Sequence, residues 1–311
     1  MPVKVTPKDF FLWFGAMVAL LGSVISFIAL LFSYIDHVFP DPLAYYADPY
    51  SGGMRFAMAT LIVLVPVLII LMRFIRQDIA AEPAKGDLWV RRWALFLTLF
   101  LAGGAIVIDL ITLINHFLGG ELTTPFVFKV LVVLFVTGGV FLHFMADMRG
   151  YWNANQGQAK MVGYAVAVLV LLSIIAGFFI MGTPGEVRLY RYDDQKVSDL
   201  QSIQWQIVNY WQQKGEIPED SAALEDPISG FRLPGDPQPP LAYMYRKTGP
   251  LSFELCATFN RESRASRAQP ARPGMEENWQ HPAGEHCFER TIDPDRYPLF
   301  EKPTPSPVRP L

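Results

Sequence analysis

Two charged residues lie within apolar stretches, where a charge is costly enough to suggest a role. Asp109 lies well inside one apolar run, and Lys129 lies near the start of the next. An ionised carboxylate in a bilayer costs at least a few kcal/mol unless it is paired or hydrated. By helical rise, Asp109 lies about 12 Å and Lys129 about 5 Å from the same membrane edge. Because a lysine stem can bridge this difference, we predict an Asp109–Lys129 ion pair.

Asp109, Thr112 and His116 share one face of a helix by their spacing. This face could form a polar path for a proton or an ion. The same residues also fit an ion pair that fixes the helix register beside a polar outer edge. We favour the ion pair, because a relay usually needs more than one deep acid.

Cys256 and Cys287 are the only cysteines, and both lie in the polar C-terminal part of the chain. They could form a disulfide, or Cys287 could join His281, Glu285 and His286 in a metal site. Adjacent ligands such as Glu285-His286-Cys287 lack the usual metal-site spacing. We therefore predict a disulfide, which by closing a loop of about 30 residues would stabilise the domain by roughly 3–4 kcal/mol.

Other residues with chemical potential form no convergent set. Asp36, His37, Asp41 and Asp48 could bind a divalent metal, but Asp-Pro pairs usually form turns. A nucleophilic Cys–His pair would need a third, orienting group, and a disulfide would consume the thiol. The sequence thus predicts no catalytic residue, no metal site and no cofactor, and we expect a protein that is not an enzyme.

Composition points to a membrane protein rather than a nucleic-acid-binding one. The 311-residue chain is 51% hydrophobic, and its net charge of −3 leaves no basic stripe for phosphates. Five runs approach or exceed the roughly 20 apolar residues that a spanning helix needs. The first run is too long for a signal peptide, and no small-residue cleavage site follows it. The runs are Phe10–Ile35, Arg55–Phe74, Trp93–Phe117, Phe126–Met145 and Met161–Met181.

The positions of Lys and Arg predict the orientation of these spans. Cations occur in the N-terminal tail, in the second loop and in the fourth loop, whereas the first and third loops have none. Lys and Arg accumulate on the cytoplasmic side. The N-terminus is therefore expected in the cytoplasm and, after five crossings, the C-terminal domain outside. Pro66 is expected to kink the second span.

The C-terminal part is expected to be a small α+β domain. Apolar residues at spacings of three and four predict a helix over Arg188–Lys214, ended by Gly215. Two strands, Ala242–Arg246 and Leu251–Phe259, are expected to form a hairpin through Lys247–Pro250. The predicted fold is thus five transmembrane helices plus a long helix on a short antiparallel sheet. Its domains are 1–160 (four spans), 161–186 (fifth span and linker), 187–300 (exported domain) and 301–311 (Pro-rich tail).

The four-span block resembles the bacterial membrane domain of unknown function 5671. The likeness covers about Phe10–Trp152. It depends on the order of apolar runs and on Asp147-Met148-Arg149-Gly150 followed by Tyr151-Trp152. The resemblance implies a bacterial cytoplasmic (inner) membrane protein and brings no activity with it.

Val187–Phe259 resembles the globular part of type IV pilins and type II secretion pseudopilins. The likeness runs from Tyr210-Trp211-Gln212-Gln213-Lys214-Gly215 and Ile217-Pro218 to Phe253-Glu254-Leu255-Cys256. Leu233-Pro234-Gly235-Asp236-Pro237 and Tyr243-Met244-Tyr245 lie between them. Pilins begin with a basic leader and carry a Glu early in a single span, and neither is present around Met161. The resemblance therefore implies a shape, without pilin processing or polymerisation.

These features predict a membrane anchor that displays a pilin-like domain outside. Its role would be to bind a partner or ligand in envelope assembly or sensing. The expected partners are the lipid bilayer and either an envelope protein or a second copy of the chain. The alternative is a small ion or solute transporter whose path is lined by Asp109 and Lys129.

Overall fold

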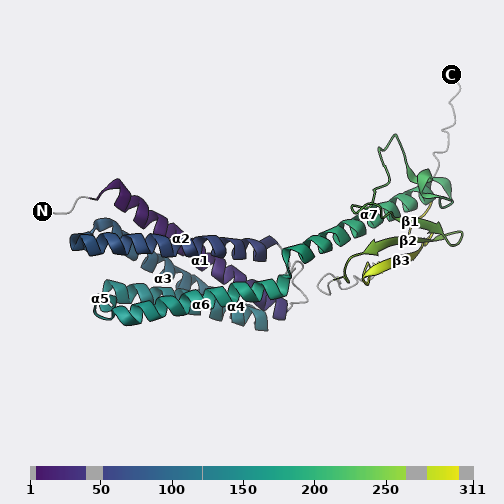
Figure 1. Ribbon diagram of the computed structural model, residues 1–311. Coiled ribbons are helices and arrows are strands. Elements are labelled where there is room, and N and C mark those ends of the chain that lie inside the picture. The colour runs from purple at the N-terminus through teal and green to yellow at the C-terminus, as the bar shows by residue number, and fades with distance from the viewer. Residues whose placement is uncertain (1–4, 40–51, 121, 264–278, 301–311) are drawn as a thin grey trace, which may run out of the picture. The chain divides into compact units, whose positions relative to one another are not determined.

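The computed structural model describes residues 5–39, 52–120, 122–263 and 279–300, apart from the Asn153 side chain. The chain divides into two compact units, Met1–Met181 and Gly182–Leu311 (Figure 1). The predicted tail, 301–311, lies outside the described residues.

The described part of unit 1 contains five long apolar helices, as predicted, and each is long and apolar enough to cross a membrane. They suggest a multi-pass membrane protein. The long helices are α1 (Pro7–Val38), α2 (Gly52–Ala81), α3 (Trp89–Gly119), α4 (Thr124–Met148) and α6 (Gln156–Met181). Two short elements, η1 (Pro83–Asp87) and α5 (Tyr151–Ala154), connect them.

The helices extend beyond the apolar runs because polar residues cap them. Thr6 and Asp9 form a capping box that starts α1, and the hydroxyl of Thr123 accepts a hydrogen bond from the amide of Phe126 at the start of α4. Gly120, with φ of 73°, ends α3 in a left-handed conformation. Helix α2 is continuous through Pro66.

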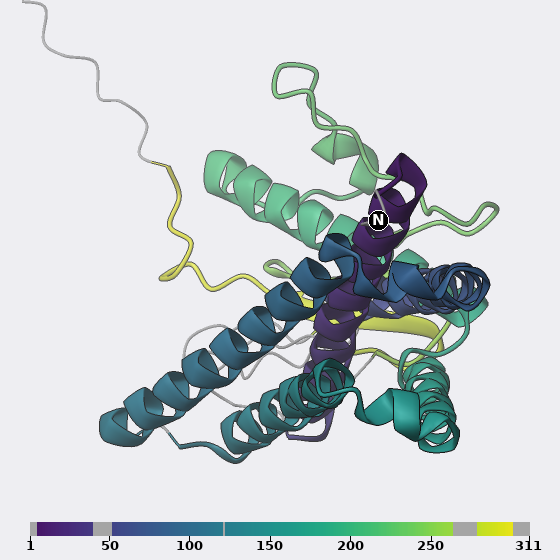
Figure 2. The same cartoon turned by 90° about the vertical axis from the view of Figure 1, so that its left-hand side faces the viewer.

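Helix α1 is central in unit 1 and packs against α2, α3, α4 and α6 (Figure 2). Close approach to α2 depends on Gly22, because a Cβ there would lie 2.6 Å from Leu64 Cδ1. Gly177 of α6 has the same role beside Met58 and Tyr34. Small residues thus allow these backbones to approach closely, as is common between membrane helices.

Unit 2 begins with α7 (Pro184–Lys214), which starts four residues earlier than predicted. Thr183 and Glu186 form a capping box, and Pro184 occupies the first turn, where its missing amide costs nothing. Gly182, with φ of 82°, separates α6 from this cap. The predicted end is confirmed, since Gly215 caps α7 with φ of 76°. A short 3₁₀ helix, η2 (Ser221–Leu224), follows.

The three strands form one antiparallel sheet in the order β1-β2-β3. They are β1 (Met244–Lys247), β2 (Ser252–Phe259) and β3 (Gly284–Thr291). The β1–β2 hairpin is confirmed, with the amides of Thr248 and Gly249 donating to the carbonyl of Ser252 in the turn. Strand β3 was not predicted, because its polar sequence lacks an alternating apolar pattern.

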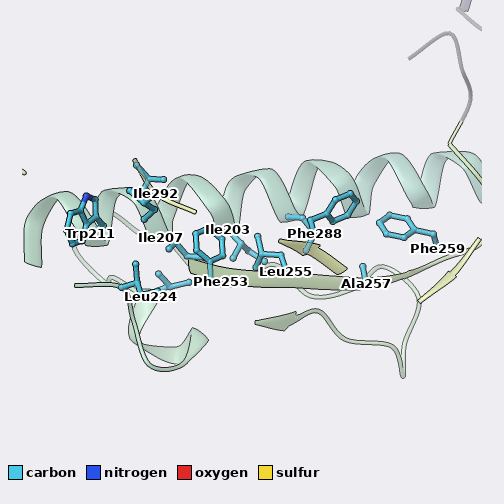
Figure 3. Packing of buried hydrophobic residues seen from close by; sticks show 13 residues of the cluster. Ile203, Ile207, Trp211, Leu224, Phe253, Leu255, Ala257, Phe259, Phe288 and Ile292 are labelled. Atoms are coloured by element: carbon cyan, nitrogen blue, oxygen red, sulfur yellow. The ribbon is translucent and has the colours of Figure 1, made fainter. Parts of the chain in front are cut away.

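One face of the sheet packs against α7 to form the core of unit 2 (Figure 3). Alternate residues of β2 point to α7, since side chains alternate between the two faces of a strand. The α7 residues recur every three or four positions, as one face of a helix requires. The buried members include Leu200, Ile203, Ile207, Trp211, Phe253, Leu255, Ala257, Phe259 and Phe288.

Candidate functional site

The predicted Asp109–Lys129 pair is wrong. The ammonium of Lys129 lies 2.6 Å from Oδ1 of Asp36, near the end of α1, and 5.6 Å from the centre of the Phe32 ring. Helix α4 packs against α1 as well as α3, and Lys129 faces α1. The prediction considered only the α3–α4 hairpin, whereas the closest acid comes from a helix about 90 residues away in sequence.

The polar face of α3 is not joined into a path among the described residues. Oδ2 of Asp109 is buried and has no hydrogen-bond partner. The hydroxyl of Thr112 donates to the carbonyl of Ile108, and Nδ1 of His116 lies 3.0 Å from the carbonyl of Thr112. The His116 ring also stacks on Phe126 of α4 at 4.1 Å. Thr112 and His116 thus bond within their own helix, and Asp109 is separate from them.

A charged cluster at the opposite end of the helices was not predicted. Asp9 is 3% exposed; it accepts hydrogen bonds from Thr6 and lies 3.3 Å from the Lys85 ammonium. This hydrogen bond with Asp9 raises the pKa of Lys85. Lys8 pairs with Asp78 of α2 at 2.7 Å. These ion pairs link α1 to α2 and to the α2–α3 connection. The cluster borders a cavity of about 10 Å³, which has room for about one water molecule. The Thr6–Asp9 spacing was the available sequence signal.

In unit 2, a buried polar seam joins α7 to the end of β2 and the loop before β1. Lys196 is 0% exposed; its ammonium donates to the carbonyl of Thr258 at 2.6 Å and lies 3.4 Å from Oδ2 of Asp236. Asp193 accepts from the backbone amides of Asn260 and Arg261 at 2.8 and 2.9 Å. Buried charges are tolerated when they are paired or hydrogen-bonded: Lys196 and Asp236 form an ion pair, and backbone amides bind the carboxylate of Asp193.

Tyrosines extend the seam along α7. The hydroxyl of Tyr243 donates to Asp199 at 2.6 Å, and burial, followed by this carboxylate, raises the tyrosine pKa. Tyr245 donates to the carbonyl of Pro218 at 2.6 Å, and burial raises its pKa to about 12. Both tyrosines therefore remain hydrogen-bond donors at neutral pH.

The sulfur atoms of Cys256 and Cys287 lie 2.06 Å apart, at disulfide distance. The alternative metal ligands do not converge on them. His286 and Cys287 are neighbours in β3 and point to opposite faces of the sheet, while the buried ring of His281 stacks on Phe259. Among the described residues, the one candidate ligand group is Glu254 with the two cysteines. This carboxylate was not in the predicted set.

The acidic residues expected before the second span are only partly described. Asp36 pairs with Lys129. Asp41 and Asp48 lie outside the described residues, and His37 already has an interaction partner. No metal group that includes Asp36 or His37 occurs in the described part of the chain.

Unit 2 also presents an apolar strip, which we define as Trp205, Tyr297, Leu299 and Phe300. Trp205, Leu299 and Phe300 are 50–57% exposed. The strip is held against α7: Trp205 and Tyr297 meet edge to face at 6.2 Å, and the amide of Phe300 donates to the carbonyl of Gln212. The strip is therefore a candidate interaction surface, because neighbouring exposed apolar residues are the feature by which such surfaces are recognised.

Comparison with known proteins places the membrane-like part of the chain. No curated protein and no solved structure matches it. Residues 9–144 match the family model described as Domain of unknown function (DUF5671). The match covers α1 to α3 and most of α4, and it ends before the whole motif from Asp147 to Trp152 on which the predicted resemblance partly depended. Over these residues the chain is similar to that family, as the sequence had indicated.

Proposed function

We propose that unit 1 anchors the protein in a bacterial cytoplasmic membrane and that unit 2 lies outside and binds a protein partner. The charge distribution supports this orientation. Of the cations at the helix ends and connections, Arg55 and Lys129 lie at one end of the bundle. The other end carries Lys8, Arg73, Arg76, Lys85, Arg91, Arg92, Arg149 and Lys160.

The apolar strip carries the proposal of partner binding. Interface hot spots are enriched in Trp and Tyr, and a handful of such residues dominates binding energy. Trp205 and Tyr297 make edge-to-face contact, and Phe300 is fixed by its backbone hydrogen bond to α7. The surface is therefore ordered before a partner arrives, which lowers the entropy lost on binding.

The pilin-like shape belongs to the same proposal. A long helix on a small antiparallel sheet, with a cysteine pair near the C-terminus, supports it. The partner would accordingly belong to pilus or secretion machinery, or to another envelope assembly. The role proposed is non-enzymatic.

The test is crosslinking in native membranes, followed by identification of what copurifies with the full chain in detergent. We expect Trp205→Ala combined with Phe300→Ala to lose a partner that the parent protein retains. Ile228→Ala is the matched control, because this side chain is 97% exposed and outside the strip. A partner that survives the double variant would contradict binding by the strip. An intact cellular phenotype after deletion of Val187–Leu311 would contradict a role for the domain.

Transport is the second candidate, and one observation supports it. Oδ2 of Asp109 is buried without a hydrogen-bond partner, which is costly in a lipid environment. An ion or proton on a transport path could satisfy it. Asp109→Asn would then abolish ion flux in liposomes while leaving the helices intact. Absence of flux in the parent protein would dismiss this candidate.

A further inference from the structure

Three sulfur-containing residues lie in one row across the sheet of unit 2. Met244 of β1 is directly opposite Cys256 of β2, and Cys256 is directly opposite Cys287 of β3. Side chains at directly opposite positions have Cβ atoms about 4.5–5.5 Å apart. The register therefore places Met244 next to Cys256, on the side of β2 opposite to Cys287, and its unbranched side chain with three rotatable bonds is long enough to turn the thioether toward the cysteine sulfurs.

The row lies on the sheet face that points away from α7. Phe253, Leu255 and Ala257 of β2 belong to the core against α7, so Cys256 and its row neighbours point to the opposite face. Met244 is 49% exposed at the edge of the sheet, and Cys287 is partly exposed, whereas Cys256 is 4% exposed. A small thiol can therefore reach the row at Cys287.

Glu254 lies beside the row but is already engaged. Its ligand oxygen and the two cysteine sulfurs lie within 4.8 Å of one another. The guanidinium of Arg246, opposite Glu254 in the register, bonds to Oε2 of this carboxylate through Nε at 3.0 Å and through a terminal amino group. Once the disulfide is reduced, the two cysteine sulfurs no longer hold each other, whereas Oε2 of Glu254 remains bound to Arg246.

We propose that, after reduction of the disulfide, Cys256, Cys287 and Met244 bind one Cu(I) ion. Two thiolates and a thioether are the soft ligands that select Cu(I). Zinc would favour Cys256, Cys287, Glu254 and a water molecule, and it would have to compete with Arg246. The oxidised row binds no metal, so binding is gated by the redox state of the cysteines.

The reductant is an external dithiol. One of its thiolates attacks Sγ of Cys287, the S–S bond breaks, and Cys256 leaves as a thiolate. The second thiol then attacks the mixed disulfide, releasing Cys287 and leaving the dithiol as a cyclic disulfide. Two electrons pass from the dithiol to the protein. Cu(I) then binds the two cysteine sulfurs, displacing any protons that they carry, and the thioether of Met244.

This site is independent of the apolar strip and of the proposed partner. The test uses the full chain in detergent, reduced with dithiothreitol and desalted without oxygen. Cu(I) is titrated in competition with bathocuproine disulfonate, whose copper complex is coloured. We expect one Cu(I) per reduced chain and none in the oxidised chain.

Substitutions identify the ligands. Met244→Leu should weaken Cu(I) binding about tenfold or more, at least the loss typical of a group that supports a metal. Glu254→Gln should leave Cu(I) binding unchanged, and Met161→Leu, an exposed methionine of unit 1, is the matched control. Cys256→Ser combined with Cys287→Ser should abolish it.

Three results would overturn the proposal. One is equal Cu(I) binding by the parent and Met244→Leu. Another is zinc binding that depends on Glu254 and exceeds Cu(I) binding. The last is loss of the near-ultraviolet circular dichroism of unit 2 on reduction, since the site needs a folded sheet.

Discussion

Both units contain lysine–aspartate pairs, and Lys196–Asp236 of unit 2 differs in burial from Lys129–Asp36 of unit 1. In unit 2, the side chains of Lys196 and Asp236 are 0% exposed, and the lysine also donates to the carbonyl of Thr258. In unit 1, Lys129 and Asp36 remain about one third exposed near helix ends. Unit 2 buries charge and compensates it with hydrogen bonds, whereas unit 1 keeps this pair where a lysine can reach a polar interface.

The two units also differ in how their side chains pack. In unit 1, glycines such as Gly22 and Gly177 allow helices to pack closely beside a buried apolar cluster that includes Phe27, Leu30 and Leu61. In unit 2, aromatic and aliphatic side chains of β2 fill the space below α7 (Figure 3). The helix contacts at these two glycines are therefore sensitive to added volume, whereas the core of unit 2 is sensitive to the loss of a side chain that fills it.

Removing the buried cation should have the largest effect. Lys196→Met leaves Asp236 without its counter-charge and the carbonyl of Thr258 without its donor. Breaking a buried pair on one side costs about 3–5 kcal/mol. We expect this loss in the free energy of unfolding of unit 2, measured in the full chain by denaturant titration of near-ultraviolet circular dichroism.

A double variant separates charge from packing. Lys196→Met with Asp236→Leu replaces both members of the pair, a change that is often close to neutral in other proteins. It should recover much of the lost stability. Equal destabilisation by the single and double variants would mean that the Thr258 hydrogen bond, not the ion pair, makes the difference between the units.

Sequence patterns predicted the helices and the hairpin well where a single hydrophobic periodicity dominates a segment. The apolar runs and the α7 periodicity located six long helices, and alternation located the hairpin. Strand β3 was not predicted, because Glu285, Glu289 and Arg290 interrupt the alternation of apolar and polar residues that indicates a strand. The helix ends were missed by a few residues because Thr6 and Thr183 act as caps outside the apolar runs.

The candidate sites were harder to predict because charged partners come from distant parts of the chain. Lys129 pairs with Asp36 and Lys85 with Asp9, across 93 and 76 residues of sequence. Helical spacing identifies residues on one face of one helix, but it does not say which helix packs there. Spacing alone therefore favoured Asp109 as the partner of Lys129.

Added volume in unit 1 should have the next largest effect. A Cβ at Gly177 would lie 2.6 Å from Met58 Sδ and 2.9 Å from the Tyr34 hydroxyl, which donates to the carbonyl of Ser173. Overpacking costs about 1–3 kcal/mol. Gly177→Ala should lower the thermal unfolding midpoint of unit 1 in detergent.

Gly163 is the matched control in the same helix, since a Cβ there would meet nothing within 4 Å. Gly163→Ala should leave the midpoint unchanged or raise it, because alanine favours helix by about 1 kcal/mol. If both variants lowered the midpoint equally, close packing at Gly177 would not explain the stability of unit 1.

The exposed pair should contribute less. Lys129→Met removes the partner of Asp36, but exposed ion pairs are typically worth about 0.2–1 kcal/mol. We expect a small decrease in the thermal midpoint of unit 1. This decrease should become smaller as the salt concentration is raised, because salt screens the ion pair. A loss as large as that of Lys196→Met would remove the distinction between the two pairs.

A pH dependence is expected from His281 in unit 2. Burial lowers the pKa of its imidazole, with a smaller contribution from His286 in the same direction, while the carbonyl of Pro282 and the carboxylate of Asp193 oppose the shift. The ordinary pKa is about 6.5. Below that pH His281 binds a proton in the unfolded chain, whereas in the folded domain it binds one only at a lower pH. Stability is therefore fully present above about pH 6.5 and is lost as the pH falls through the folded pKa.

His281→Phe should reduce this pH dependence. The phenyl ring can keep the stack on Phe259, and the Ser263 hydrogen bonds involve only the backbone of residue 281. The free energy of unfolding of unit 2, measured from pH 7 to pH 5, should fall less in this variant than in the parent. Asp226→Asn is the control, because local hydrogen bonds lower the pKa of Asp226 below its usual 3.8, outside this window. A parent slope that persists unchanged in His281→Phe would contradict the assignment of the acid sensitivity to His281.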